Sequence, residues 1–353
     1  MEQKQIILSK WMTREHSLFY AHVWLKANKD CFDKRIVDKG VQNLVFKLND
    51  KGVLEVYYDL EELDSISEAM VKAFNCNPEI LDELILKFYN YWKKISPYLS
   101  EKKGIQSISE LKEFYSNWIE WWDAMGYLFI VPDQKNIVEE LRQKALKPRV
   151  ETQEFSGAGD NVFINFVKNK YPKYASIAQF LTPEEAFRLD SISEKEVQSI
   201  KEREKGYALV ILSGESKLIN LTDLEPELRK NNLSLEEIKE KKTNEIKGLA
   251  ASPGLIRGKV RVILKKSDLT SLEKGEIMVT YATSPEYVPA MKKSAGIITD
   301  EGGIVCHASI VSRELGIPCV VGTKVGTQIL KNGMDIELNA TKGIIKILER
   351  KST

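Results

Sequence analysis

The chain has little histidine and almost no net charge. Its 353 residues include only three histidines, His16, His22 and His307, and 52 basic side chains nearly balance 51 acidic ones. A protein that binds nucleic acid or an anionic membrane surface carries a basic patch, and this composition offers no excess of positive charge for one. We therefore expect neither nucleic acid nor a membrane as a partner, but something smaller or more specific.

Cysteine and long apolar runs are scarce as well. No apolar run approaches the roughly eighteen residues of a membrane span, and the first residues lack the apolar core of a signal peptide. These absences favour a cytoplasmic location. No cluster of His, Cys and carboxylate residues has ligand spacing, so no metal site is predicted. No disulfide framework is predicted either, because no CxxC pair occurs among the four cysteines, Cys31, Cys76, Cys306 and Cys319.

Glycine is unevenly distributed and marks a domain boundary. Residues 1–247 contain eight of the 20 glycines, and the remaining residues contain the other twelve. Before the boundary, apolar residues recur at three- and four-residue spacing, for example over 65–95, as in amphipathic helices. Two alternating runs predict one β-hairpin over 43–60. We expect residues 1–245 to form a mainly helical domain with this hairpin as a small satellite sheet.

Two helix starts in that domain have a clear signature. Thr182 and Ser193 each supply an N-cap hydroxyl followed by acidic first-turn residues, and Pro183 stands at the first helical position. We expect a helix to begin after each hydroxyl.

Residues 246–353 have a different pattern. Short β-branched runs separated by glycine turns predict strands, and the segments 285–293 and 306–315 are typical of helices. About a hundred residues suffice for a compact unit with its own core. The expected fold class of the whole chain is therefore multi-domain, α plus α/β, with the α/β domain second.

The stretch "TDEGGIVCHASIVSRELGIPCVVGT", residues 299–323, places one histidine where chemistry is expected. An apolar strand leads to Gly302 and Gly303, and a helix follows with His307 in its first turn. The free amide hydrogens of a helix N-terminus favour a nearby anion, and a neutral imidazole is a competent nucleophile. The pattern predicts that His307 receives and passes on a phosphoryl group. The alternative is a histidine that only satisfies a helix start.

This stretch resembles, nearly position for position, the phosphohistidine segment of the phosphoenolpyruvate-utilising enzymes. That family includes phosphoenolpyruvate synthase, pyruvate phosphate dikinase and rifampin phosphotransferase. The segments 248–263 and 277–300 are also similar to the family's swivelling β/β/α domain. The resemblance covers about residues 250–350 and implies that residues 246–353 form a swivelling phosphohistidine domain with His307 as the phosphorylated residue.

The resemblance also implies supporting residues around His307. Thr299, Gly302 and Gly303 would shape the loop, and Arg313 and Glu314 would complete the signature. Arg313 is either a solvated helix residue or a phosphate clamp. We expect Cys306 to be a supporting thiol rather than a second nucleophile. Ser309 stands where alanine is usual, and we expect little consequence.

Two parts of the longer family members are not found in this sequence. No GxxxxGK[ST] loop or ATP-grasp pattern precedes the swivelling domain, and too few residues follow it for a phosphoenolpyruvate barrel. The order of a large helical region before a swivelling domain resembles rifampin phosphotransferase and split systems with a separate ATP-binding subunit. The resemblance implies a phosphotransferase component whose ATP-grasp or phosphoenolpyruvate-binding partner phosphorylates His307. Mg²⁺ with ATP is expected mainly on that partner.

The phosphoryl acceptor is expected to be a small molecule bound by the helical domain. Arg14 or His16 could activate an acceptor hydroxyl or hold a phosphate, because such a transfer uses general bases and guanidinium groups. The aromatic face of the segment 114–129 is more readily explained as a core seam than as a ligand pocket.

Two other functions are consistent with the sequence. The chain could be a phosphohistidine carrier or regulatory protein without acceptor chemistry, or an inactive relative that serves as an interaction module. Phosphate on His307 without turnover would favour the first, and an unphosphorylated His307 would favour the second.

Overall fold

The structure is a computed structural model. It describes residues 5–30, 32–152, 155, 157–236, 244–304 and 306–348. The chain divides into two compact units, one of residues 1–11 and 16–236 and one of residues 12–15 and 237–353. The main division thus comes after Glu236, whereas the sequence predicts a boundary after residue 245. None of the helices described is long and apolar enough to cross a membrane.

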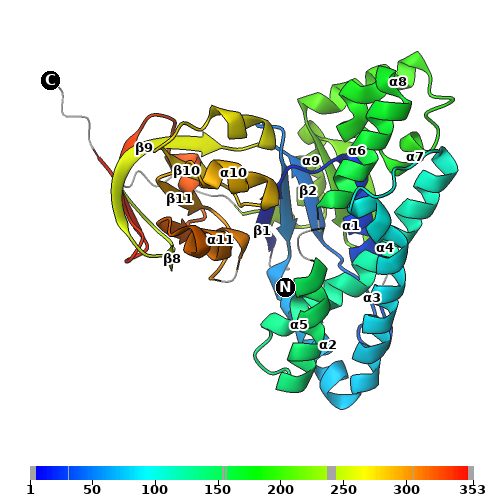
Figure 1. The fold of residues 1–353 in the computed structure, drawn as a ribbon. Helices are drawn as coiled ribbons and strands as arrows, with labels where there is room; N and C mark the ends of the chain where they lie inside the picture. The colour runs from blue at the N-terminus through cyan, green and yellow to red at the C-terminus, as the bar shows by residue number, and fades with distance from the viewer. Residues whose placement is uncertain are drawn as a thin grey trace. The chain divides into compact units, whose positions relative to one another are not determined.

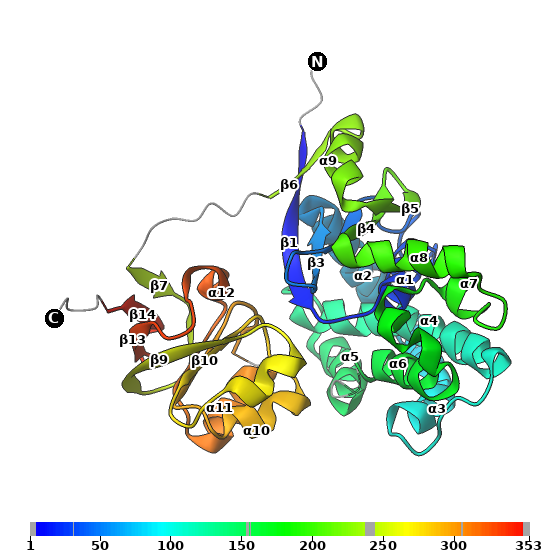
Figure 2. The ribbon, with the colours of Figure 1, turned by 90° about the horizontal axis from the view of Figure 1, so that it is seen from above.

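The first unit contains a six-stranded sheet, and this corrects the prediction of a small hairpin among helices. The strand order is β5-β4-β2-β3-β1-β6 (Figures 1 and 2). The strands are β1 (Ile6–Arg14), β2 (Leu44–Leu48), β3 (Leu54–Tyr58), β4 (Tyr207–Leu212), β5 (Glu215–Asn220) and β6 (Leu233–Leu235).

The predicted hairpin is the centre of that sheet. Strands β2 and β3 pair antiparallel, as the alternating sequence indicates, but β2 also pairs antiparallel with β4. Strand β4 is buried at every position, so its sequence has no polar and apolar alternation. Its partner lies far away in the sequence, and local pattern carries no information about such a pairing.

Helices cover both faces of this sheet. The α-helices are α1 (Leu18–Lys29), α2 (Leu60–Cys76), α3 (Pro78–Leu99), α4 (Ile108–Ile130), α5 (Glu139–Thr152), α6 (Ala158–Lys170), α7 (Pro183–Ala186), α8 (Glu194–Glu202) and α9 (Leu221–Lys230). Successive residues of a strand point to opposite faces. Accordingly Val45 packs in the cluster that α9 covers, while Phe46 contacts Trp24 of α1 at 5.8 Å between ring centroids.

The aromatic face of α4 is a core seam, as we interpret it from the sequence. Trp118 and Trp121 are fully buried, and Phe114 is nearly so. Helix α4 runs beside α3 in Figures 1 and 2. Burial of several large rings is a major source of stability for this unit.

Both predicted helix starts are confirmed. The Thr182 hydroxyl accepts from the amide of Glu185, and the Glu185 carboxylate accepts from the amide of Thr182. Ser193 and Glu196 form the same reciprocal pair at the start of α8. Each pair satisfies amides that a helix N-terminus would otherwise leave without partners.

The second unit is an α/β domain around an eight-stranded sheet of order β7-β14-β13-β9-β10-β11-β12-β8. Within this sheet, β9, β10, β11 and β12 form a run of four strands in which each adjacent pair is parallel. The strands are β7 (Glu245–Lys247), β8 (Leu249–Ser252), β9 (Leu255–Ile263), β10 (Ile277–Thr280), β11 (Gly296–Thr299), β12 (Cys319–Val321), β13 (Asp335–Asn339) and β14 (Ile344–Ile347).

Short helices cover the two faces of the parallel strands. Helices α10 (Val288–Met291) and α11 (His307–Leu315) lie on one face and α12 (Gly326–Ile329) lies on the other, as Figure 2 shows. The side chain of Ile297 packs toward α10 and α11, and that of Ile298 packs toward α12. Each face therefore has its own apolar core.

Candidate functional site

His307 lies beyond the carboxyl end of a buried parallel strand. Strand β11 is fully buried, and α11 begins at His307 itself. The loop between them needs glycine at one position: Gly302 has φ +101°, and a Cβ there would lie 2.7 Å from the Cys306 Sγ. Nothing lies within 4 Å of a Cβ built on Gly303. The strand, the loop and the helix together present the imidazole at one edge of the sheet.

The imidazole is held through one of its ring nitrogens. The His307 Nδ1 lies 2.8 Å from the hydroxyl of Thr283, in the segment that follows β10. The sequence analysis missed Thr283. A signal was available, because β10 and β11 are neighbouring parallel strands and the segments after them meet at the same sheet edge.

Burial favours the neutral form of the imidazole. His307 is part-buried, and burial lowers its pKa below the ordinary value, while the charges of Glu286 and Glu314 oppose the shift. A neutral imidazole has one nitrogen with a free electron pair, which is the form that acts as a nucleophile.

The start of α11 is tied to the glycine loop. Cys306 is the N-cap residue, and its side chain caps no amide of the helix. The hydroxyl of Ser309 donates to the carbonyl of Gly303 at 2.8 Å and lies 3.4 Å from the Cys306 Sγ. Ser309 is fully buried, and its hydroxyl links the helix to the loop.

Thr299 anchors the other end of the loop. Its buried hydroxyl donates to the carbonyl of Glu301 at 2.6 Å, and its own carbonyl accepts from the amide and hydroxyl of Thr323. The next residue, Asp300, accepts from the hydroxyl of Thr323 at 2.8 Å and from the amide of Thr327 at 3.1 Å. The sequence analysis missed Asp300 and Thr323, which fix the strand end that carries the loop.

Arg313 and Glu314 have different positions. The Arg313 Nη1 donates to the carbonyl of Ile304 at 3.0 Å, so the guanidinium group braces the loop from the helix side. Glu314 is exposed and acts on His307 through its charge. Arg313 is exposed, and its guanidinium group contacts two backbone carbonyls, those of Ile304 and Ala251, so the contacts do not decide between the two sequence interpretations.

The two acceptor-side candidates lie at the start of the chain. Arg14 is the last residue of β1. The His16 Nδ1 lies 3.6 Å from a carboxylate oxygen of Asp160, and its ring meets the ring of Tyr20 at 4.2 Å between centroids. His22 is part-buried in α1, and its Nδ1 lies 2.9 Å from the carbonyl of Leu18.

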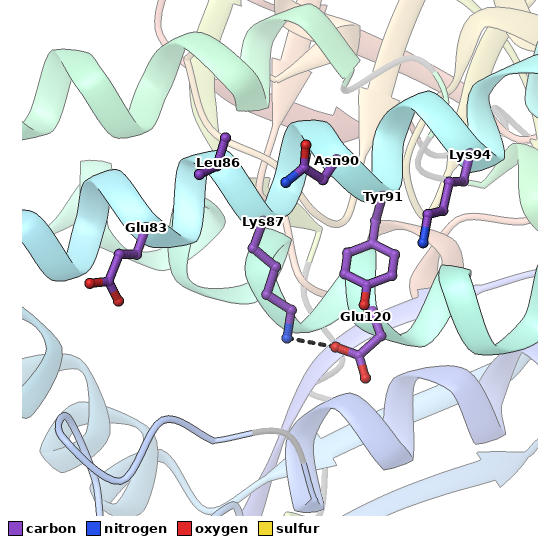
Figure 3. A pocket seen from close by; sticks show the side chains of 7 residues that line it. All are labelled: Glu83, Leu86, Lys87, Asn90, Tyr91, Lys94 and Glu120. Atoms are coloured by element: carbon purple, nitrogen blue, oxygen red, sulfur yellow. Dashed lines mark ion pairs between the residues drawn. The ribbon is translucent and has the colours of Figure 1, made fainter.

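A groove of about 700 Å³ runs along α3 and is lined by Glu83, Leu86, Lys87, Asn90, Tyr91, Lys94 and Glu120 (Figure 3). The Lys87 ammonium pairs with Glu120 at 2.7 Å and with Asp123 at 2.5 Å. Burial raises the pKa of Asp123 to about 6, although Lys87 opposes the shift. The central lysine of the groove is therefore paired with two carboxylates. No group of three potential metal ligands occurs in the part of the chain that the structure describes.

Comparison with known proteins finds similarity in the segment that contains this site. Residues 272–343 match the family described as "PEP-utilising enzyme, mobile domain". The chain is 54% identical over 112 residues to a probable phosphoenolpyruvate synthase of Archaeoglobus fulgidus. The aligned residues make up 31% of this chain and 15% of that protein. It is also 54% identical over 100 residues to phosphoenolpyruvate synthase of Pyrococcus furiosus. Here the aligned residues make up 28% of this chain and 12% of that protein. The chain therefore spans a small part of these relatives.

Among solved structures, the chain is similar to an NMR structure titled Enzyme I (nEIt). The similarity covers 77% of this chain and 82% of that one, with 16% identity and a TM-score of 0.23. A TM-score this low supports no conclusion about the fold.

Proposed function

We propose that this chain, whose residues 272–343 belong to the mobile-domain family of phosphoenolpyruvate-utilising enzymes, is a phosphotransferase component that carries a phosphoryl group on His307. The observation that carries the proposal is the contact between the Nδ1 of His307 and the hydroxyl of Thr283, at the start of α11. With its proton on Nδ1 and donated to Thr283, the imidazole keeps its free electron pair on Nε2. Nε2 is then the nucleophile.

In the loading step, Nε2 attacks the phosphorus of the donor. A nitrogen–phosphorus bond forms, the bond from phosphorus to the donor oxygen breaks, and the electron pair leaves with that oxygen. The charged oxygens of the phosphoryl group lie near the first amides of α11, which have no side-chain cap from Cys306. Thr299, Gly302, Gly303 and Arg313 hold the loop in place for this step.

The donor is proposed to bind to a separate protein in the cytoplasm. An ATP-grasp partner, with Mg²⁺ on its nucleotide, phosphorylates His307 in trans; a phosphoenolpyruvate-binding partner is the other form of the same proposal. The relatives named phosphoenolpyruvate synthase support phosphoryl transfer as the chemistry of the matched region. The first unit then provides the site for a small-molecule acceptor.

The test is transfer of label to His307. The purified chain is incubated with Mg²⁺ and ATP labelled on its β and γ phosphates, with and without a candidate ATP-grasp protein, and in parallel with labelled phosphoenolpyruvate. Acid-labile label is mapped by mass spectrometry, and His307→Ala is the control. Label on His307 that requires the partner supports the split phosphotransferase.

The other outcomes separate the alternatives. Stable label on His307 that no acceptor removes indicates a carrier or regulatory protein. An unlabelled His307, with a partner that is active on another carrier, contradicts the proposal and favours an interaction module.

A further inference from the structure

In the first unit a buried carboxylate lies beside His16, one of the three histidines of the chain. Asp160, in the first turn of α6, is only 8% exposed. It accepts hydrogen bonds from the amide of Ser17, at 2.9 Å, and from the Ser17 hydroxyl. One of its oxygens also lies 3.6 Å from the Nδ1 of His16. The carboxylate is thus held by α1 on one side and faces an imidazole on the other.

The imidazole of His16 packs against an aromatic side chain that itself stacks on a second one. Its ring meets Tyr20 edge-on, and Tyr20 stacks on Trp118 at 4.9 Å between centroids. The start of α6 closes the other side with two glycines. A Cβ on Gly157 would lie 3.7 Å from the Cε1 of His16, and a Cβ on Gly159 would lie 2.2 Å from the ring of Trp118. Only glycine fits against that indole.

A buried donor without a partner lies at the same place. Trp118 is fully buried, and its Nε1 has no hydrogen-bond partner among the described residues. The Cε2 atom, which is bonded to that nitrogen, lies within 2.4 Å of a Cβ built on Gly159. Trp121 and Trp122 of the same helix also have a buried Nε1 without a partner among the described residues, so this N–H alone does not identify a ligand.

The carboxylate determines what the imidazole can do. A carboxylate beside Nδ1 favours the proton on Nδ1 and leaves the electron pair of Nε2 to accept a proton. It also stabilises the imidazolium ion that forms. A separation of 3.6 Å is long for a hydrogen bond, but such contacts shorten when a substrate is bound.

We propose that His16, oriented by Asp160, is the general base of the acceptor site and that the acceptor is a neutral hydroxyl compound, an alcohol or a phenol. The inference rests on the proposed function, because His307 must supply the phosphoryl group. The acceptor's O–H bond breaks and its proton goes to the Nε2 of His16. The acceptor oxygen bonds to phosphorus, and the electron pair of the nitrogen–phosphorus bond returns to the Nε2 of His307.

The surroundings distinguish a hydroxyl acceptor from an anionic one. A phosphate or carboxylate acceptor is already deprotonated and needs no base, and the charge of Asp160 would repel it. A neutral hydroxyl needs a base, which His16 would supply. Among the described residues, Tyr207 is a further titratable group on which the charge of Asp160 acts, and its pKa is raised by burial and then by that charge.

The first test measures the orientation of His16 by NMR titration. The chain has only three histidines, so each imidazole signal can be assigned with one substitution. Asp160→Asn is expected to lower the pKa of His16 by about one unit, since it removes the facing negative charge, and to leave His22 and His307 unchanged. Ser17→Ala is the matched control, because it removes a partner of Asp160 and keeps the charge. An unchanged pKa of His16 in Asp160→Asn overturns the inference.

The second test measures transfer from a chain loaded without any partner. His307 is phosphorylated chemically with phosphoramidate, loading is mapped by mass spectrometry against His307→Ala, and transfer to water, glycerol and benzyl alcohol is followed by ³¹P NMR. We expect His16→Gln and Asp160→Asn to slow transfer roughly a hundredfold at equal loading and to abolish its rise with pH. Ser17→Ala keeps the pH profile.

The outcomes separate this inference from the proposed function. Equal transfer and equal pH profiles in the wild type and His16→Gln overturn the inference, whether or not a probe is phosphorylated, and leave the carrier function standing. If Asp160→Asn lowers only thermal stability, Asp160 has a purely structural role and the inference is again overturned. Failure of every donor protein to label His307 contradicts the proposed function instead.

Discussion

At the scale of single residues, the site depends on which nitrogen of His307 is held and on how the imidazole is kept neutral. Thr283 contacts Nδ1 at 2.8 Å from a neighbouring strand end, and burial lowers the pKa of the ring. In the proposed function both effects act on the same electron pair, because donation from Nδ1 to Thr283 places it on Nε2 and the lowered pKa favours its unprotonated form. Each can be tested with a substitution that leaves the loop intact.

Thr283→Val is expected to slow the phosphorylation of His307 on the order of tenfold to a hundredfold, because the imidazole loses the partner that fixes its orientation. Thr283→Ser keeps the hydroxyl and should restore most of the rate. The measurement is the initial rate of label incorporation, with circular dichroism to confirm folding. Equal rates in the wild type and Thr283→Val would exclude a positioning role for this residue.

The pH dependence of His307 follows from its lowered pKa. Because the folded protein binds this proton less readily than the unfolded chain, the neutral nucleophile should persist below the ordinary value of 6.5. Glu286→Gln removes a charge that opposes the shift, so it should lower the pKa further. Titration of the His307 signal by NMR, with the urea-unfolded chain as reference, checks both statements. A folded-state pKa above that of the unfolded chain would be incompatible with them.

At the scale of secondary-structure elements, the site is one unit of strand, loop and helix. Two adjacent glycines in the loop have different requirements. Gly302 has a positive φ and a sulfur atom where a Cβ would be, whereas a Cβ on Gly303 meets nothing within 4 Å. This difference provides a matched pair of substitutions.

Gly302→Ala is expected to destabilise the second unit by about 1–3 kcal/mol, because it combines backbone strain with a clash at Cys306, and to reduce labelling of His307. Gly303→Ala should leave the free energy of unfolding nearly unchanged. Denaturant unfolding and label incorporation are measured on both variants. Similar losses of stability and labelling in both variants would show that the loop does not require glycine at residue 302 more than at residue 303.

The reciprocal caps in the first unit permit a test that does not involve the site. Thr182→Ala removes the hydroxyl that accepts from the amide of Glu185 and should lower the free energy of unfolding by about 1 kcal/mol. Thr182→Ser keeps the cap and should cost little. Labelling of His307 should be the same in both variants, and a selective loss in Thr182→Ala would contradict this separation.

At the scale of the whole molecule, the chain consists of two compact units, each with its own sheet and apolar cores. A unit with its own core can fold independently of its neighbour. The carrier chemistry requires only the second unit, and the proposed acceptor chemistry requires the first. The two activities should therefore be separable.

A fragment of residues 244–353 is expected to fold and to accept label on His307, but not to transfer it to a hydroxyl compound. Cooperative thermal unfolding and label incorporation are measured on the fragment, with the same fragment carrying His307→Ala as the control. Transfer to glycerol or benzyl alcohol by the fragment alone, at the rate of the full chain, would show that the first unit contributes nothing to the acceptor step.

The sequence by itself determined the features that depend on neighbouring residues. The capping residues Thr182 and Ser193, the hairpin of β2 and β3, and the glycine loop before His307 are each formed by a few consecutive residues whose chemistry favours one local conformation. Such features can be predicted because the interacting groups lie within a turn or two of each other. The resemblance to the mobile-domain family, which the comparisons confirm, depends on the same local stretch.

Only the tertiary structure decided what distant segments do together. The six-stranded sheet of the first unit pairs β2 with β4, and the site gains Thr283 from a neighbouring strand end. Likewise, Asp160 reaches His16 and Ser17 across more than a hundred residues of chain. These contacts carry no local pattern, because packing of the core, and not the conformation of adjacent residues, brings their side chains within reach of one another.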